Sequence, residues 1–161
     1  MHASILITDD DRGFRETLRG VFEPEGFHTL LAENGAEALD IVRSNDVHLL
    51  LLDMHMPRLT GLETLRMVKK LKSRLPCILL SAHPDEGLVE QALRADAFSF
   101  LTKPVSRYTI TSTVRLALAK TYDWAAEATA DHDVDPGLRE PNRSATAPRF
   151  DPRNLFGRGD H

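Results

Sequence analysis

The chain has 161 residues, 42% hydrophobic and 27% charged, which is typical of one globular domain with some additional length. Its net charge of −4 gives no electrostatic basis for binding nucleic acid or an anionic membrane, and no apolar run approaches the roughly 20 residues of a membrane span. A single cysteine excludes an intrachain disulfide, and the N-terminus has no signal-peptide pattern, so we expect a cytoplasmic protein.

Short apolar runs alternate with amphipathic segments from residue 4 to about 122, and this alternation predicts βαβ units around a parallel sheet. The predicted strands span 4–8, 27–32, 47–52, 77–81 and 98–102. The predicted helices span about 12–23, 35–44, 62–73, 85–95 and from Ser106 to about 122, the last with room to continue to about 130. The expected fold class is therefore α/β, a doubly wound parallel sheet with helices on both faces.

The chain changes character after this alternating region. Residues 131–161 contain four prolines and three glycines and have little periodic hydrophobicity. Such a segment cannot bury enough apolar surface to offset the entropy lost on ordering it. We predict a domain over residues 1–122 followed by a disordered tail over 131–161. The tail is too short and too weakly patterned for a helix-turn-helix, which disfavours a DNA-binding output.

Polar residues stand at the carboxyl ends of four predicted strands, where open α/β sheets place their ligands. They are Asp9, Asp10, Asp53, Ser81 and Lys103. If the first and third strands are neighbours, three carboxylates meet at one edge, and a cation is needed to neutralise their repulsion. Hard oxygen ligands suit Mg²⁺, which can also hold a phosphoryl group beside a lysine and a hydroxyl. The pattern predicts a Mg²⁺ and phosphoryl site, with an aspartate as a chemically reasonable covalent acceptor.

The acidic pair, the segment Asp53-x-x-x-Pro57, the hydroxyl residue Ser81 and the pair Lys103-Pro104 resemble the receiver domain of two-component response regulators. The resemblance covers residues 4 to about 122 and is nearest to stand-alone receivers of the chemotaxis type. It implies a five-stranded, flavodoxin-like sheet of order 2-1-3-4-5. It also implies a signalling switch that catalyses only its own Mg²⁺-dependent phosphorylation and dephosphorylation.

Transferred by position, the resemblance makes Asp53 the acceptor of a phosphoryl group from a histidine kinase or a phosphotransfer protein. Mg²⁺ would be bound by Asp10, by Asp9 directly or through water, by Asp53, and by the backbone carbonyl of His55. The side chains of His55 and His83 stand where the family tunes phosphoryl lifetime. The downstream partner would be a protein, and a phosphorylation-dependent homodimer is a further expectation.

The remaining matched positions belong to the switch. Ser81 corresponds to the hydroxyl that bonds the phosphate, Lys103 to the lysine that pairs with phosphoryl oxygens, and Phe100 to the rotating aromatic. The Lys103-Pro104 bond is expected to be cis. The surface that switches would be formed by the fourth helix, the fifth strand and the fifth helix.

Two other readings compete with a phosphorylated receiver, and one position departs from the family pattern. A phosphatase of the haloacid dehalogenase type needs a second aspartate two residues after its nucleophile, where this chain has His55. A pseudo-receiver would keep the fold and bind protein without phosphorylation. Asp96 stands where the family commonly has glycine, and if that position needs a positive φ, aspartate tolerates it better than most residues.

Overall fold

One five-stranded parallel sheet forms the centre of the computed structural model, which describes residues 2–122. The strands are β1 (Ser4–Thr8), β2 (His28–Ala32), β3 (Leu49–Asp53), β4 (Cys77–Ser81) and β5 (Ser99–Thr102). Their order is β2-β1-β3-β4-β5, and every neighbouring pair is parallel. The predicted fold class and strand order are therefore confirmed.

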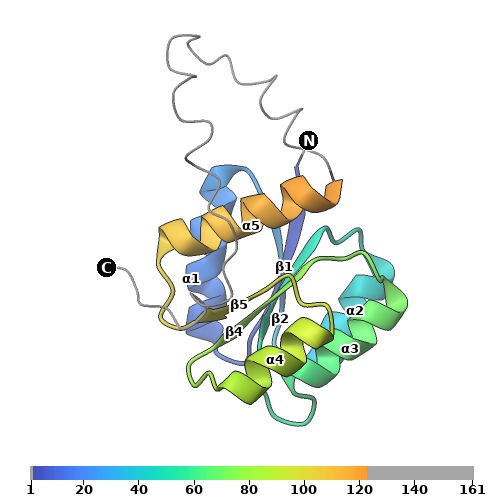
Figure 1. Cartoon of the computed structure of the whole chain (residues 1–161). Coiled ribbons are helices and arrows are strands. Elements are labelled where there is room, and N and C mark those ends of the chain that lie inside the picture. Colours follow the sequence, from blue (N-terminus) through green and yellow to red (C-terminus); the bar gives the residue numbers. More distant parts are fainter. Residues whose placement is uncertain (1, 123–161) are drawn as a thin grey trace.

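Helices cover both faces of this sheet (Figure 1). They are α1 (Arg12–Phe22), α2 (Gly35–Ser44), α3 (Gly61–Leu71), α4 (Glu86–Arg94) and α5 (Arg107–Tyr122). Helices α1 and α5 pack on one face, and α2, α3 and α4 pack on the other. This two-faced covering explains why the central strands are almost uniformly apolar.

Side-chain caps define where all five helices begin, and at α5 the backbone N–H of Thr109 donates to Ser106 Oγ. Asp11, Asn34, Thr60 and Asp85 each accept a hydrogen bond from a backbone N–H in the first turn of the helix that follows. Thr60 and Glu63 form a reciprocal capping box at the start of α3. These residues satisfy N–H groups that have no partner within the helix, so each helix start is encoded locally.

Several predicted boundaries were wrong by one or two residues. Helix α1 ends at Phe22 rather than 23, because Pro24 lies in a 3₁₀ turn (Glu23–Glu25) that closes at Gly26 with φ of 95°. Helix α3 begins at Gly61, directly after its Thr60 cap and one residue earlier than predicted, and it ends at Leu71 rather than 73. Strands β2 and β5 begin one residue later than predicted, and α4 is one residue shorter at each end.

Strand β3 was predicted over 47–52 but runs from Leu49 to Asp53. The N–H of Val47 is held by the carbonyl of Asn45 in the preceding turn. At the other end, Asp53 pairs with Leu80 of β4. The phosphoacceptor candidate therefore belongs to the strand itself, and the sheet positions its backbone.

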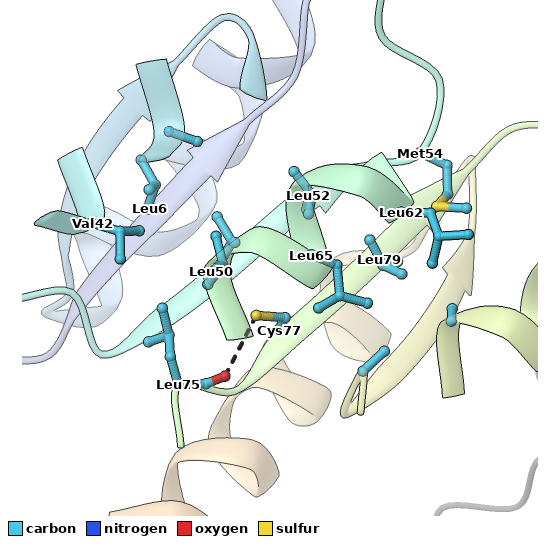
Figure 2. Packing of buried hydrophobic residues seen from close by; sticks show 14 of the residues in the cluster. Leu6, Val42, Leu50, Leu52, Met54, Leu62, Leu65, Leu75, Cys77 and Leu79 are labelled. Atoms are coloured by element: carbon cyan, nitrogen blue, oxygen red, sulfur yellow. Dashed lines mark hydrogen bonds between the residues drawn. The ribbon is translucent and has the colours of Figure 1, made fainter. Parts of the chain in front are cut away.

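The core on the α2, α3 and α4 face is tightly apolar (Figure 2). Leu6, Leu50, Leu52 and Leu79 project from neighbouring strands toward these helices. Cys77 is buried among them and donates a 3.4 Å hydrogen bond to the carbonyl of Leu75. Burial raises the pKa of the Cys77 thiol to about 12, so this cysteine is structural rather than reactive.

Two predictions lie outside the described residues, namely the continuation of the last helix to about 130 and the tail over 131–161. Within residues 2–122, no helix is both long and apolar enough to cross a membrane.

Candidate functional site

Strand alternation delivers three charged residues to one face of the sheet. Residues two positions earlier in each strand pack beneath α1 and α5; they are Ile7, Leu51 and Leu101. Because side chains alternate along a strand, Asp9, Asp53 and Lys103 leave the carboxyl edge on that same face. The sequence prediction that these residues meet is confirmed by their distances.

Lys103 bridges the two buried carboxylates. Its Nζ lies 2.7 Å from Oδ2 of Asp9 and 3.2 Å from Oδ1 of Asp53. Asp9 is 1% exposed and Asp53 5% exposed, so both carboxylates are removed from bulk water. The ring of Phe14, on α1, lies 4.2 Å from the same Nζ and supplies a cation–π contact. The ammonium group is therefore held on three sides.

The pKa values of Asp53 and Lys103 are both raised above their ordinary values. Burial raises the pKa of Asp53, the negative charge of Asp9 raises it further, and Lys103 opposes both effects. Burial alone would lower the pKa of Lys103, but its hydrogen bond to Asp9 and the charge of Asp53 raise it above the usual value. The lysine is thus stabilised as a cation, while Asp53 is a carboxylate held at an energetic disadvantage.

Oxygens of Asp9, Asp10 and Asp53 all lie within 4.8 Å of one another, which is close enough for one ion to contact all three. Asp10 is exposed at the rim, whereas the other two are buried. Carboxylate oxygens with an open, solvated side suit a hard divalent cation. The residues present therefore fit the Mg²⁺ predicted from the sequence.

The hydroxyl of Ser81 lies between two histidines. The backbone N–H of His83 donates to Ser81 Oγ at 3.0 Å, and His55 Nε2 shares a 2.9 Å hydrogen bond with the same oxygen. The two imidazole rings meet edge to face with centroids 6.2 Å apart. The sequence singled out both histidines, but it did not predict the bond between His55 and Ser81.

Phe100 lies inside the molecule rather than at the site edge. Its ring is fully buried and packs in the core beneath α4, beside Val89 and Ala92. The aromatic therefore adopts an inward position in this structure. Because this residue is also a core residue, its burial does not by itself assign the switch role expected from the sequence.

Backbone geometry confirms one expectation and settles one open condition. The Lys103-Pro104 peptide is cis, as predicted. Asp96, in the loop before β5, has φ of 68°, so this position does take the positive φ that the sequence analysis considered, whereas the φ of 69° at Arg58 was not anticipated. Gly61 donates its N–H to the carbonyl of Met54, so α3 begins directly against the end of β3.

Two contacts of α1 with the site were missed by sequence reasoning. Arg15 donates from Nη1 to the Asp9 carbonyl at 2.7 Å, and Phe14 lies against Lys103. The position of Phe14 on the apolar stripe of α1 indicated that it faces the sheet. Nothing in the stripe indicated that its neighbour would be a lysine 89 positions later in the chain.

The fold and this edge define a flavodoxin-like α/β protein with a carboxylate cluster and a partly buried lysine at the carboxyl ends of its strands. The family model described as response regulator receiver domain matches residues 5–115, and the chain belongs to that family. Receiver domains are signalling switches of two-component systems.

Relatives and solved structures agree with this assignment. The chain is 37% identical over 148 residues to the response regulator MprA of Mycobacterium bovis, covering 89% of this chain and 64% of MprA. It thus spans slightly less than two thirds of the curated relatives it matches. A receiver domain from Clostridium thermocellum is 29% identical with a TM-score of 0.70, covering 73% of this chain and 95% of that one. A CheY-like receiver from Methanospirillum hungatei, 24% identical with a TM-score of 0.74 (76% and 98% covered), supports the fold.

Replacing Asp53 with asparagine should raise the free energy of unfolding at neutral pH. The raised pKa of Asp53 means that folding favours the protonated form, so stability is lost as pH rises through that pKa. A neutral amide removes this penalty. The stability gained by the variant should shrink as pH falls below the pKa of Asp53. Urea unfolding at pH 7 and at mildly acidic pH measures both effects. The control is Asp40→Asn, because Asp40 is an exposed carboxylate on α2. This substitution should change stability by at most about 0.5 kcal/mol.

Proposed function

We propose that this protein is a cytoplasmic phosphoacceptor response regulator whose receiver domain spans residues 1–122. Asp53 accepts a phosphoryl group from the phosphohistidine of a histidine kinase or a phosphotransfer protein. The observation that carries the proposal is the Lys103 ammonium, held between Asp9 and Asp53 beside the rim carboxylate of Asp10. A lysine in this position can meet the oxygens of a phosphoryl group as they arrive.

The reaction requires little covalent chemistry from the protein. An oxygen of Asp53 bonds to phosphorus as the phosphorus–nitrogen bond of phosphohistidine breaks, and its electron pair returns to the imidazole nitrogen. Asp9, Asp10, Asp53 and the backbone carbonyl of His55 would hold Mg²⁺, which would neutralise charge on the phosphoryl oxygens. Lys103 then exchanges its contact with Asp53 for a contact with the phosphoryl group. The Ser81 hydroxyl donates to another phosphoryl oxygen.

Output follows from a change in the surface formed by α4, β5 and α5. Movement of Ser81 toward the phosphoryl group frees space beside β5, and rotation of Phe100 accompanies it. Tyr108, on α5, is 74% exposed and is an apolar contact residue on this surface. The surface binds a downstream protein or a second copy of the chain, and we propose no nucleic acid or membrane partner.

The exposed rings of His55 and His83 are proposed to set phosphoryl lifetime. The His55 ring bonds the Ser81 hydroxyl, with which the phosphoryl group must come into contact, and the His83 ring packs edge to face against the His55 ring. Side chains in this position control the approach of water to the acyl phosphate.

The test is phosphoryl incorporation from acetyl phosphate, followed by intact mass spectrometry. The wild type should form an adduct that requires Mg²⁺ and is labile in base, and Asp53→Asn should form none. Asp11→Asn is a matched control, because the Asp11 carboxylate caps α1. This variant should still form the phosphoryl adduct. Absence of an adduct in the folded wild type would favour the pseudo-receiver, a protein-binding module without phosphorylation.

A further inference from the structure

The Ser81 hydroxyl is already engaged in the unphosphorylated protein. Ser81 is fully buried at the end of β4, and its Oγ bonds the His83 N–H and the His55 ring. His55 belongs to the loop after β3, so this hydrogen bond joins that loop to the end of β4, 26 residues later in sequence. Both imidazoles are exposed, and the His55 ring contacts the buried hydroxyl and packs edge to face on the His83 ring.

The need to pair every buried donor indicates whether Ser81 Oγ or His55 Nε2 donates the hydrogen bond between them. A serine hydroxyl has one proton to donate and two lone pairs, and one lone pair of Ser81 accepts the His83 N–H. If His55 Nε2 carried the proton, the buried hydroxyl proton would have no acceptor, because no other hydrogen bond of this group is found within residues 2–122. If Nε2 carries no proton, the Ser81 hydroxyl donates to it, and the Nδ1–H group of the exposed His55 ring faces water. The second arrangement leaves no buried donor unsatisfied.

This arrangement places His55 in competition with a phosphoryl group. Phosphoryl oxygens only accept hydrogen bonds, so the Ser81 hydroxyl must donate its single proton to them. We propose that His55 is a positioning residue that holds this proton in the resting state, and that phosphorylation of Asp53 must take the donor away from it. The inference rests on the proposed function and deepens it, because it names the side chain that opposes the switch.

The binding test uses fluoroberyllate, a mimic of an aspartyl phosphate, with saturating Mg²⁺ at one fixed pH, followed by ¹⁹F NMR. His55→Leu should bind the mimic about two- to tenfold more tightly, since one ordinary net hydrogen bond no longer opposes it. His55→Gln retains an acceptor and should return toward wild-type affinity. Equal or weaker binding by His55→Leu would overturn the proposal.

A double-mutant cycle separates the hydrogen bond from simple crowding by the ring. With Ser81→Ala as background, His55→Leu should leave affinity for the mimic unchanged, because the hydroxyl is already absent. The same gain in that background would mean that the ring acts through its bulk, and would overturn the proposal.

A measurement on the free protein keeps this inference distinct from the proposed function. Long-range ¹H–¹⁵N spectra of the histidines should show His55 with its proton on Nδ1, and Ser81→Ala should shift the Nε2 resonance. A His55 proton on Nε2 would overturn the inference even in a protein that accepts phosphoryl groups. If the wild type neither binds the mimic nor forms an adduct, the proposed function fails. The histidine spectrum still decides whether the Ser81 hydroxyl donates its proton to His55.

Discussion

Lys103→Met should destabilise the fold by about 3–5 kcal/mol at neutral pH, the largest thermodynamic effect we expect from a single substitution in the site. The side chain of Lys103 is 19% exposed, and it pairs with the two buried carboxylates of Asp9 and Asp53. Methionine preserves the aliphatic stem but leaves Asp9 and Asp53 as buried like charges. Urea unfolding followed by circular dichroism measures the loss.

Two conditions should restore stability to the Lys103→Met variant. The proposed binding of Mg²⁺ to the folded carboxylate cluster should offset part of the lost stability, more so than in the wild type. Lowering the pH should also reduce the difference in unfolding free energy between the Lys103→Met variant and the wild type. Lys103 lowers the pKa of Asp53, so without the lysine this pKa rises further, and the folded variant takes up a proton as pH falls through it.

Lys120→Met is the matched control for charge. Lys120 is an exposed residue in the last turn of α5, and its loss should change stability by no more than about 0.5 kcal/mol, with no response to Mg²⁺. If Lys103→Met unfolds at the same urea concentration as the wild type, the two carboxylates are not destabilising one another and our account of the site is wrong.

Gly61→Ala should impair both the fold and phosphoryl acceptance. A Cβ at this position would collide with the carbonyl oxygen of Asp53 and would lie 2.6 Å from Cα of Met54. Both are backbone atoms at the end of β3, the strand that carries the proposed acceptor Asp53, so β3 or α3 must move, at a cost of about 1–3 kcal/mol. A displacement of roughly 1 Å at a reacting group slows chemistry on the order of a hundredfold. Unfolding and the rate of adduct formation from acetyl phosphate measure the two effects.

Gly20→Ala supplies the comparison for the same substitution. Gly20 lies on the exposed side of α1, and nothing is within 4 Å of a Cβ built there. Alanine should stabilise this helix by about 0.5–1 kcal/mol and leave the adduct rate unchanged. Normal adduct formation by Gly61→Ala would show that the end of β3 tolerates movement and that the acceptor need not be held rigidly.

Local signals account for most of the predicted elements. The apolar runs 4–8 and 77–81 match β1 and β4 because a strand buried on both faces needs an uninterrupted apolar sequence. Predicted boundaries failed where the turn chemistry of Pro24 and the cap at Thr60 outweighed apolar spacing. These signals were present in the sequence, but they are weaker than hydrophobic periodicity.

The meeting of Asp9, Asp53 and Lys103 was determined by the sequence itself. Each stands at the end of an apolar run, and right-handed crossovers bring the carboxyl ends of parallel strands to one edge. Strand alternation then selects the face, so neighbours far apart in sequence could be inferred without coordinates. The family resemblance added the role of each residue.

Only the tertiary structure decided which side chains touch within that edge. The His55 ring on Ser81, the Phe14 ring on Lys103 and the inward burial of Phe100 each depend on a loop path or a rotamer. Such choices are made by packing between elements that are distant in sequence, whereas strand ends and apolar runs are set by nearest neighbours along the chain. The sequence thus determined which groups gather at the carboxyl edge of the sheet. The packing of the folded chain determined which of these side chains contact one another.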